Sequence, residues 1–390
     1  MFFKKLISFL VAGVMVLSLA SCGGGTEPGN TEEPSGDSGS EEIVIGFVGP
    51  LTGPVSIYGL AASEGAQLYF EQNPTILGKT VRLELLDDKH DTSEAVTAYN
   101  RLVGNMGATA IIGAVTSKPA IALSIEAAKK GTPVITPTGT AAEITTYGEN
   151  IFRACFLDPY QGQTMADFAY DSLGNKNIAI LFDSADDYSS GVAEAFEAAF
   201  TAKGGTIVAN EAYTSGDTDF NAQLTKIKNE NPDALFLPIY YSDVAMISTQ
   251  AKAMGFSTQL LGIDGWDGVI DILDDVSAVE GAYFCNHYST EDTSEEVQNF
   301  VTSYEEKYGS LPNSFAALGF DTAHVIADAI ERAGSGDSAA IVEAIKTTEL
   351  PVVTSKSPLK FDEGGDPIKG ISIIKIVDGK HTLDTQSNPE

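Results

Sequence analysis

The sequence predicts an α/β protein made of two lobes, each a parallel sheet covered by helices. Short apolar runs alternate with helical patterns from residue 42 onward, and the alternation restarts after residue 155. With 390 residues, 43% of them hydrophobic, the chain is long enough for two domains with sizeable cores.

The first half of the folded region reads as four strands alternating with three helices. A loop rich in threonine follows the fourth strand, and a further helical pattern starts at Ala141. Either Thr92 or Ser93 is the expected N-cap of the second helix. The strands are expected at 42–51, 81–88, 108–115 and 133–137, and the helices at 63–73, 92–105 and 119–131.

The second half repeats the alternation and ends in a helical segment. Helices at 160–174, 191–205, 220–232 and 243–255 are expected to alternate with strands at 177–188, 206–213, 233–241 and 259–264. Three further helices at 295–309, 314–334 and 338–350 must return to one of the two lobes, and an apolar strand at 371–380 closes the chain.

The N-terminus resembles a bacterial export signal. Lys4 and Lys5 precede an apolar stretch at 6–20, and "LASC" (19–22) is similar to a lipobox. The resemblance implies a lipoprotein signal peptide at 1–22, with Cys22 as the lipidated, membrane-anchored first residue of the mature chain. A plain signal peptide or a transmembrane helix is the alternative. Residues 23–41 lack large apolar side chains, so we expect a disordered linker.

Bulk charge and motif content limit the functions that the chain can have. The net charge of −31 argues against nucleic acid and against a basic patch for anionic lipid. Four histidines without ligand spacing, and no G-x-S-x-G or H-E-x-x-H motif, argue against an enzyme. We therefore expect no catalytic residues, no metal and no cofactor.

Two threonine- and serine-rich loops are candidates for holding a carboxylate. "GAVTSKPA" contains Ser117, and "TPTGTAA" contains Thr138 and Thr140; each loop lies between a strand and a helix. Helix N-termini expose free N–H groups, and hydroxyls beside them add donors. The alternative is that these residues are ordinary helix caps.

Strand ends in the second lobe are candidates for holding an ammonium group. Tyr188 and Tyr240 end two strands, and Asp264 ends the next strand, two residues before Trp266. A carboxylate flanked by aromatic rings suits a cation. Ligands of open α/β sheets bind beyond the carboxyl ends of strands, so the two sets of loops predict an α-amino acid in a cleft. Asp264 as a simple turn residue is the alternative.

The chain resembles the leucine/isoleucine/valine-binding proteins of ABC transporters over nearly all of residues 42–385. The motifs that carry the resemblance occur in the family's order: "GFVGPLTGPVSIYG", "LLDDKHDTSEAV", "IIGAVTSKPA", "VITPTGTAAEIT", "FRACFLDPYQGQTMADF" and "LKFDEGGDPI". The resemblance implies the type I periplasmic-binding fold, in which two doubly wound, Rossmann-like lobes are joined by three hinge crossings.

Matching positions then imply a ligand site. To the residues above, the resemblance adds Thr116 and the residues expected around the ligand side chain. The implied site comprises Tyr58, Val115, Thr116, Ser117, Thr138, Thr140, Tyr188, Tyr240, Asp264, Trp266 and Phe315. The chain departs from the family in two ways: the ammonium partner, Asp264, is often Glu there, and the first-lobe disulfide of several members is absent here.

The resemblance also implies the domain limits. Lobe 1 would comprise 42–154 and 286–360, and lobe 2 would comprise 155–285 and 361–385. Cys155 and Cys285 would then lie on crossing strands, either close together or as separately buried small residues.

The function implied is that of an extracytoplasmic, membrane-anchored and monomeric receptor, which delivers an amino acid to an ABC permease. Branched-chain aliphatic amino acids are the default, and aromatic or small polar amino acids and amides such as urea stay open. A ligand-sensing receptor that is not coupled to transport is the alternative function.

Overall fold

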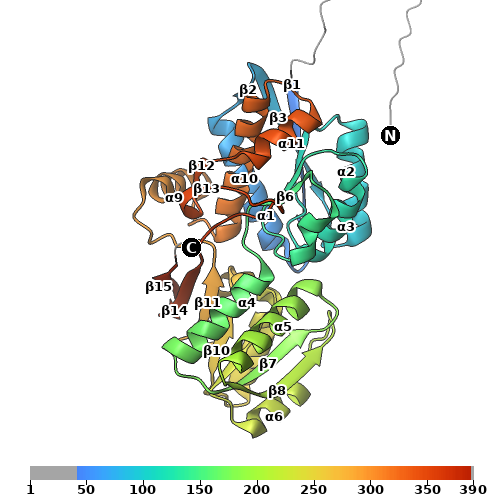
Figure 1. Cartoon of the computed structure of the whole chain (residues 1–390). Helices are drawn as coiled ribbons and strands as arrows, with labels where there is room; N and C mark the ends of the chain where they lie inside the picture. The colour runs from blue at the N-terminus through green and yellow to red at the C-terminus, as the bar shows by residue number, and fades with distance from the viewer. Residues whose placement is uncertain (1–41, 388–390) are drawn as a thin grey trace, which may run out of the picture. The chain divides into compact units, whose positions relative to one another are not determined.

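Two sheets organise the part of the chain that the computed structural model describes, residues 42–387 (Figure 1). The first has six strands in the order β2-β3-β1-β4-β5-β6, and the second has seven in the order β15-β14-β11-β10-β9-β7-β8. The predicted α/β fold with two lobes is confirmed. Below, lobe 1 is built around the first sheet and lobe 2 around the second. The predicted signal segment, Cys22 and the linker lie outside the described residues.

Lobe 1 is centred on β1, which pairs in parallel with both β3 and β4. Every residue of β1 after Glu42 is buried, as expected for an apolar strand with helices on both faces. Only β2 runs antiparallel to its neighbour, β3. The strands of this sheet are β1 (Glu42–Gly49), β2 (Thr75–Ile76), β3 (Lys79–Asp87), β4 (Ala110–Ile112), β5 (Val134–Thr136) and β6 (Ile151–Arg153).

Helices from both ends of the chain cover lobe 1. The N-terminal ones are α1 (Ser56–Gln72), α2 (Thr92–Asn105), α3 (Ser117–Ala128) and the short 3-10 helix η1 (Ala142–Tyr147). The C-terminal ones are α9 (Glu295–Tyr308), α10 (Ser314–Ala333) and α11 (Ser338–Lys346), followed by the pair β12 (Leu350–Val352) and β13 (Ser355–Leu359). Figure 1 shows these orange and red helices beside the blue elements of the N-terminus.

Two glycines bring α1 and α10 into close contact. A Cβ at Gly65 would lie 1.9 Å from the carbonyl oxygen of Ala316, and one at Gly319 would lie 2.0 Å from that of Ala62. Neither position therefore accepts a side chain unless the two helices move apart. This contact shows that the C-terminal helical segment packs on lobe 1 and not on lobe 2.

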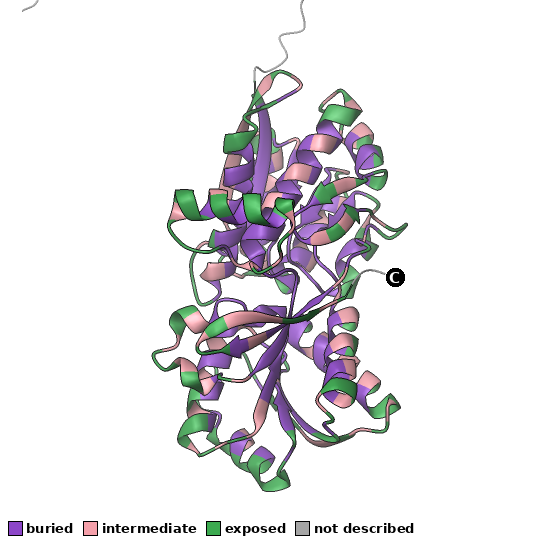
Figure 2. Cartoon of the chain, turned by 90° about the vertical axis from the view of Figure 1, so that its left-hand side faces the viewer, coloured by how far each residue is buried: buried purple, intermediate pink, exposed green. Residues whose placement is uncertain are grey.

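Lobe 2 is mostly parallel, with an antiparallel edge made by the C-terminal hairpin β14–β15. Its strands are β7 (Asn177–Asp183), β8 (Thr206–Tyr213), β9 (Ala234–Phe236), β10 (Gln259–Gly262), β11 (Tyr283–Asn286), β14 (Ser372–Val377) and β15 (Lys380–Gln386). Its helices are α4 (Asp158–Asp167), the π-helical turn η2 (Phe168–Ser172), α5 (Asp187–Ala202), α6 (Asn221–Glu230), α7 (Tyr241–Ala253), η3 (Asp264–Trp266), α8 (Val269–Ile272) and η4 (Val276–Ala278). Figure 2 shows the central strands buried and the outer faces of the helices exposed, whereas the edge strands β8 and β15 are only partly buried.

The chain passes between the sheets after β6, after β11 and between β13 and β14. Buried Arg153 ends β6 and pairs with Asp366 on the third passage. Its guanidinium also donates to the carbonyl oxygens of Gly139 (3.1 Å) and Ala141 (2.9 Å). The arginine thus joins two passages to the threonine-rich loop after β5. The lobe limits given above, 42–154 with 286–360 and 155–285 with 361–385, stay a prediction.

Some local expectations were wrong. The N-cap of α2 is neither Thr92 nor Ser93 but Asp91, whose carboxylate accepts from the N–H groups of Ser93 and Glu94. A carboxylate one residue earlier reaches both donors and adds a favourable charge at the helix start. The pattern from Ala141 gives only the 3-10 helix η1.

Cys155 and Cys285 are both buried, free thiols. Their side chains belong to different hydrophobic clusters, and each donates to a different carbonyl, that of Gly139 and that of Gln161. The structure therefore has no disulfide between Cys155 and Cys285.

Candidate functional site

The lobe 1 side of the site is made by the loops that follow β4 and β5. Because these strands are parallel neighbours, both loops leave the same edge of the sheet. The hydroxyl of Thr138 donates to the carbonyl oxygen of Val115 (2.5 Å), and Oγ of Ser117 accepts from the N–H of Ala141 (3.2 Å). These two bonds hold the loops together as one polar surface.

Backbone donors are available on this surface. Thr116 is the N-cap of α3, so the first N–H groups of that helix, those of Ser117 and Lys118, have no intrahelical acceptor. Among residues 42–387, no hydrogen bond engages the N–H of Thr138 or Thr140. The surface therefore offers neutral donors to an anion without placing a cationic side chain in contact with it.

The lobe 2 side is centred on Asp264, which begins η3 directly after β10 and is 2% exposed. The Tyr188 hydroxyl donates to Oδ1 of Asp264 (2.6 Å) and accepts from the N–H of Gly265 (2.9 Å). Nε2 of His287 lies 3.0 Å from Oδ2. The carboxylate is thus held in a fixed orientation at the end of the strand.

Aromatic rings close the space between the two sides. Tyr58 stacks on Phe315 with ring centroids 4.1 Å apart, and both side chains come from lobe 1 helices. Tyr240, the N-cap of α7, stacks on Tyr188 at 4.8 Å and meets Tyr58 edge to face at 5.7 Å. Apolar Val115 adds to this wall.

Two tyrosines also join the lobes directly. The Tyr58 hydroxyl donates to the carbonyl oxygen of Gly265 (2.5 Å) and accepts from the N–H of Tyr241 (3.1 Å). In return, the Tyr241 hydroxyl accepts from the N–H of Ile57 (3.3 Å). This reciprocal contact, hereafter the tyrosine latch, holds the lobes against each other beside the cavity.

A small cavity lies between these groups. The structure brings together there every site residue predicted from the sequence except Trp266, and it adds Gly265. The lining residues are Tyr58, Val115, Thr116, Ser117, Thr138, Thr140, Tyr188, Tyr240, Asp264, Gly265 and Phe315.

Trp266 lies outside the cavity. Its indole N–H donates to the carbonyl oxygen of Leu237 (2.9 Å), and its ring stacks near Phe284. A Cβ at Gly262 would lie 2.2 Å from the ring, so the indole occupies space that this glycine leaves open. Trp266 therefore packs behind the strand end rather than beside a ligand.

Asp158, which the sequence analysis did not single out, lies beside the site at the start of α4. Its N–H donates to the carbonyl oxygen of Thr140 (3.0 Å), and its Oδ1 accepts from Gln161 (3.0 Å). Burial raises the pKa of this carboxyl to about 8, although hydrogen bonds from Thr140 and Gln161 oppose the shift. Asp158 is therefore mainly protonated at pH 7, so it adds little negative charge beside Asp264.

Gln161 connects the two acids, because its Oε1 accepts from the N–H of Asp264 (3.3 Å). Asp158 and Gln161 both lie in the motif "LDPYQG", which is the local sequence signal for them. No group of histidine, cysteine and acidic side chains within residues 42–387 has the arrangement of a metal site.

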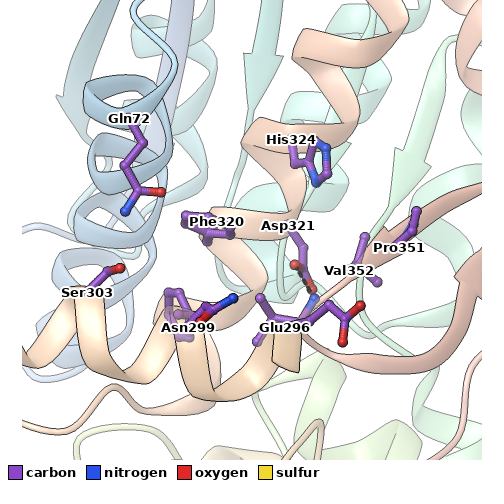
Figure 3. A pocket seen from close by; sticks show the side chains of 11 residues that line it. Gln72, Glu296, Asn299, Ser303, Phe320, Asp321, His324, Pro351 and Val352 are labelled. Atoms are coloured by element: carbon purple, nitrogen blue, oxygen red, sulfur yellow. Dashed lines mark hydrogen bonds between the residues drawn. The ribbon is translucent and has the colours of Figure 1, made fainter. Parts of the chain in front are cut away.

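A second, larger cavity lies within lobe 1 and has about 510 Å³ of empty space (Figure 3). Its walls come from α1, α9, α10 and the β12 region, and Figure 3 shows His324 and Asp321 on one helix above Asn299 and Glu296. Asp321 is engaged by the N–H groups of Val353 and Thr354. Because every wall belongs to one lobe, closure of the lobes cannot enclose a ligand there.

Comparisons with known proteins identify the family and the fold of the chain. Residues 42–380 match the family described as periplasmic binding protein. The chain is 32% identical over 347 residues to the Leu/Ile/Val-binding protein BraC3 of Rhizobium johnstonii, covering 87% of this chain and 93% of that protein. Within the described residues, no helix is both long and apolar enough to cross a bilayer.

Three solved structures illustrate the structural similarity. A leucine binding protein, LivK, from Thermotoga maritima is 37% identical with a TM-score of 0.84, covering 89% of this chain and 99% of that one. LivJ from Streptococcus pneumoniae, in complex with isoleucine, is 30% identical with a TM-score of 0.82 and the same coverage. A solute binding protein from R. palustris in complex with benzoate is 23% identical with a TM-score of 0.82, covering 89% and 97%, and shows the common fold.

Proposed function

The chain belongs to the periplasmic binding protein family, and we propose that it is an extracytoplasmic receptor that binds an α-amino acid between its lobes and delivers it to an ABC permease. One observation carries the proposal. The interlobe cavity has neutral hydrogen-bond donors on one side and the buried carboxylate of Asp264 on the other. This arrangement is complementary to a zwitterion.

On the lobe 1 side, the ligand carboxylate would be held by the loops after β4 and β5. The hydroxyl of Ser117 and the N–H groups of Thr138 and Thr140 are the donors available there, next to the N-terminus of α3. Several neutral donors can stabilise one anion without the desolvation cost of a buried cationic side chain.

On the lobe 2 side, Asp264 would accept from the ligand ammonium, and the faces of Tyr188 and Tyr240 would add cation–π attraction. No lysine or arginine lines the cavity. A ligand that has a carboxylate but no ammonium, such as benzoate, would bury its charge together with that of Asp264, so aromatic acids are disfavoured.

The ligand side chain would contact Tyr58, Val115 and Phe315. These residues make an apolar wall, and the small cavity leaves no buried charge for a polar side chain to meet there. Together with the leucine- and isoleucine-binding relatives, this wall supports a branched-chain aliphatic amino acid.

Binding would be coupled to hinge closure. The ligand touches both lobes only when they are closed, so it stabilises the closed form by its contacts with the second lobe. The tyrosine latch contributes to the same state without ligand. The closed form would then present surfaces of both lobes to the permease.

The N-terminal part of the proposal rests on the sequence. We propose a lipid anchor at Cys22, with residues 23–41 as the tether between the membrane and a monomeric binding domain. Mass spectrometry of the mature protein from cells tests this directly, because a diacylglycerol at Cys22 adds a defined mass that Cys22→Ala removes.

A thermal-shift screen on residues 42–390, unfolded and refolded to remove carried-over ligand, tests the proposed function. The panel comprises the amino acids, short amides and urea. A ligand at about 1,000 times its Kd adds about 4 kcal/mol of stability. We expect stabilisation by aliphatic amino acids. Stabilisation by amides alone would overturn the role of Asp264, and no response to any compound would favour a sensor of another ligand.

A further inference from the structure

His287 approaches the ligand site from the hinge without lining the cavity. It follows β11 on the second passage between the lobes and is 2% exposed. Its ring stacks on Phe156 of the first passage, with centroids 3.8 Å apart, and Nε2 lies 3.0 Å from Oδ2 of Asp264. Residues of two hinge passages therefore determine where this ring, and with it the Asp264 carboxylate, lies.

The chemistry of the pair fixes the direction of the hydrogen bond. An ionised carboxylate only accepts, so Nε2 carries the hydrogen and donates to it. Nδ1 then carries a lone pair, and it has no hydrogen-bond partner among residues 42–387. With the Tyr188 hydroxyl on Oδ1, each oxygen of Asp264 has one protein donor and keeps acceptor capacity for a ligand.

The charged groups around His287 come from two segments of the chain. Asp264 and Asp267 lie on or just after η3, and Lys369 lies before β14. Burial lowers the pKa of His287, Lys369 lowers it further, and the two aspartates oppose the shift. Protonation would also place an N–H at Nδ1 where no acceptor is available. The ring is therefore neutral at pH 7.

We infer that His287 is a positioning residue for amino acid binding: its neutral form orients the Asp264 carboxylate toward the ligand ammonium, and its protonated form competes with that ammonium for the same carboxylate. The inference rests on the proposed function. It assigns a role to a hinge residue that touches no ligand, and it makes amino acid affinity fall as the pH falls.

Two substitutions distinguish the orienting effect of His287 on the Asp264 carboxylate from the effect of protonating the His287 ring. His287→Gln keeps an amide N–H that can reach Asp264 but cannot take up a proton, whereas His287→Leu removes the donor and keeps an apolar contact with Phe156. His90→Gln is a matched control because His90 bonds the hydroxyl of Thr116 on the lobe 1 side, and His324→Gln is a control distant from the site.

The experiment is calorimetric titration of the purified protein with leucine from pH 7.5 to pH 5. For the wild type and both controls, we expect Kd to rise as the pH falls, by at least threefold once His287 is protonated. His287→Gln should stay within about threefold of wild type at pH 7.5 and show no rise. His287→Leu should bind at least tenfold more weakly throughout.

Two results would overturn the inference: wild-type affinity in His287→Leu, or an unchanged rise of Kd in His287→Gln. If His287→Leu does not fold, the pH profile of His287→Gln decides alone. A wild type that binds no amino acid at all would instead refute the proposed function, and the inference with it.

Discussion

The two sides of the interlobe cavity differ in the groups that they offer to a charged ligand. Lobe 1 offers several neutral groups from two loops, tied together by bonds such as that from Thr138 to Val115. Lobe 2 offers a single buried charge, Asp264, held by Tyr188 and His287. Under the proposed function, recognition on lobe 1 would be shared among several donors, whereas recognition on lobe 2 would depend on one side chain.

The largest effect is expected from Asp264→Asn. The amide keeps the size of the side chain but removes the charge, leaving the ligand ammonium buried without its counter-ion. Breaking a buried ion pair costs about 3–5 kcal/mol, so leucine affinity should fall by about two to four orders of magnitude in calorimetry. Exposed Asp274→Asn in the same lobe is the control. A Kd within threefold of wild type would remove Asp264 from the ammonium site.

A smaller effect is expected from Ser117→Ala on the lobe 1 side. The change removes one hydroxyl donor and the acceptor for the Ala141 N–H, but the backbone donors of the two loops remain. Loss of one such bond costs about 1–2 kcal/mol, so Kd should rise by about tenfold. A loss of leucine affinity as large as that in Asp264→Asn would contradict the proposal that several donors of lobe 1 bind the ligand carboxylate together.

Tyr58→Phe tests the connection between the two sides. It removes both bonds of the Tyr58 hydroxyl in the tyrosine latch while keeping the ring against Phe315. The closed form should lose about 1 kcal/mol, so stopped-flow measurements should show leucine leaving about fivefold faster. Tyr69→Phe, on the same helix but facing Phe320 and His324, is the control and should leave the rate unchanged.

Asp158→Asn should have the smallest effect on affinity at pH 7, because the wild-type carboxyl is already mainly protonated. Its effect should instead appear in stability. The pKa of Asp158 is raised from 3.8 to about 8 in the folded protein, so wild-type stability falls as the pH rises between these values. The Tm of Asp158→Asn, relative to wild type without ligand, should therefore rise from pH 5 to pH 8. Parallel Tm curves would contradict a raised pKa.

Much of the site followed from the sequence because its residues lie at strand ends. In parallel sheets these ends share one edge, so the sequence alone placed the loops of Ser117 and Thr138 at the edge of one sheet and that of Asp264 at the edge of the other. The side-chain direction of Trp266 could not be predicted from the sequence. It depends on the space left by Gly262 and on the hydrogen bond to the carbonyl oxygen of Leu237.

Residues that act from the hinge were missed for a different reason. His287 and Asp158 contact the site through partners more than 15 residues away in sequence, and no local periodicity marks such contacts. The final hairpin was missed although a local signal was present. Asp378 and Gly379 both have positive φ, as a tight hairpin turn requires, and "DG" is a typical sequence for it.

The proposed function requires each side of the cavity to bind one charged group of an amino acid. Calorimetry with leucine and its two single-group analogues tests it most directly: 4-methylpentanoate lacks the ammonium, and 3-methylbutylamine lacks the carboxylate. We predict that leucine binds and that each analogue binds at least about 100-fold more weakly, since each leaves one side of the cavity without its partner. Binding of 4-methylpentanoate as tight as that of leucine would contradict the account.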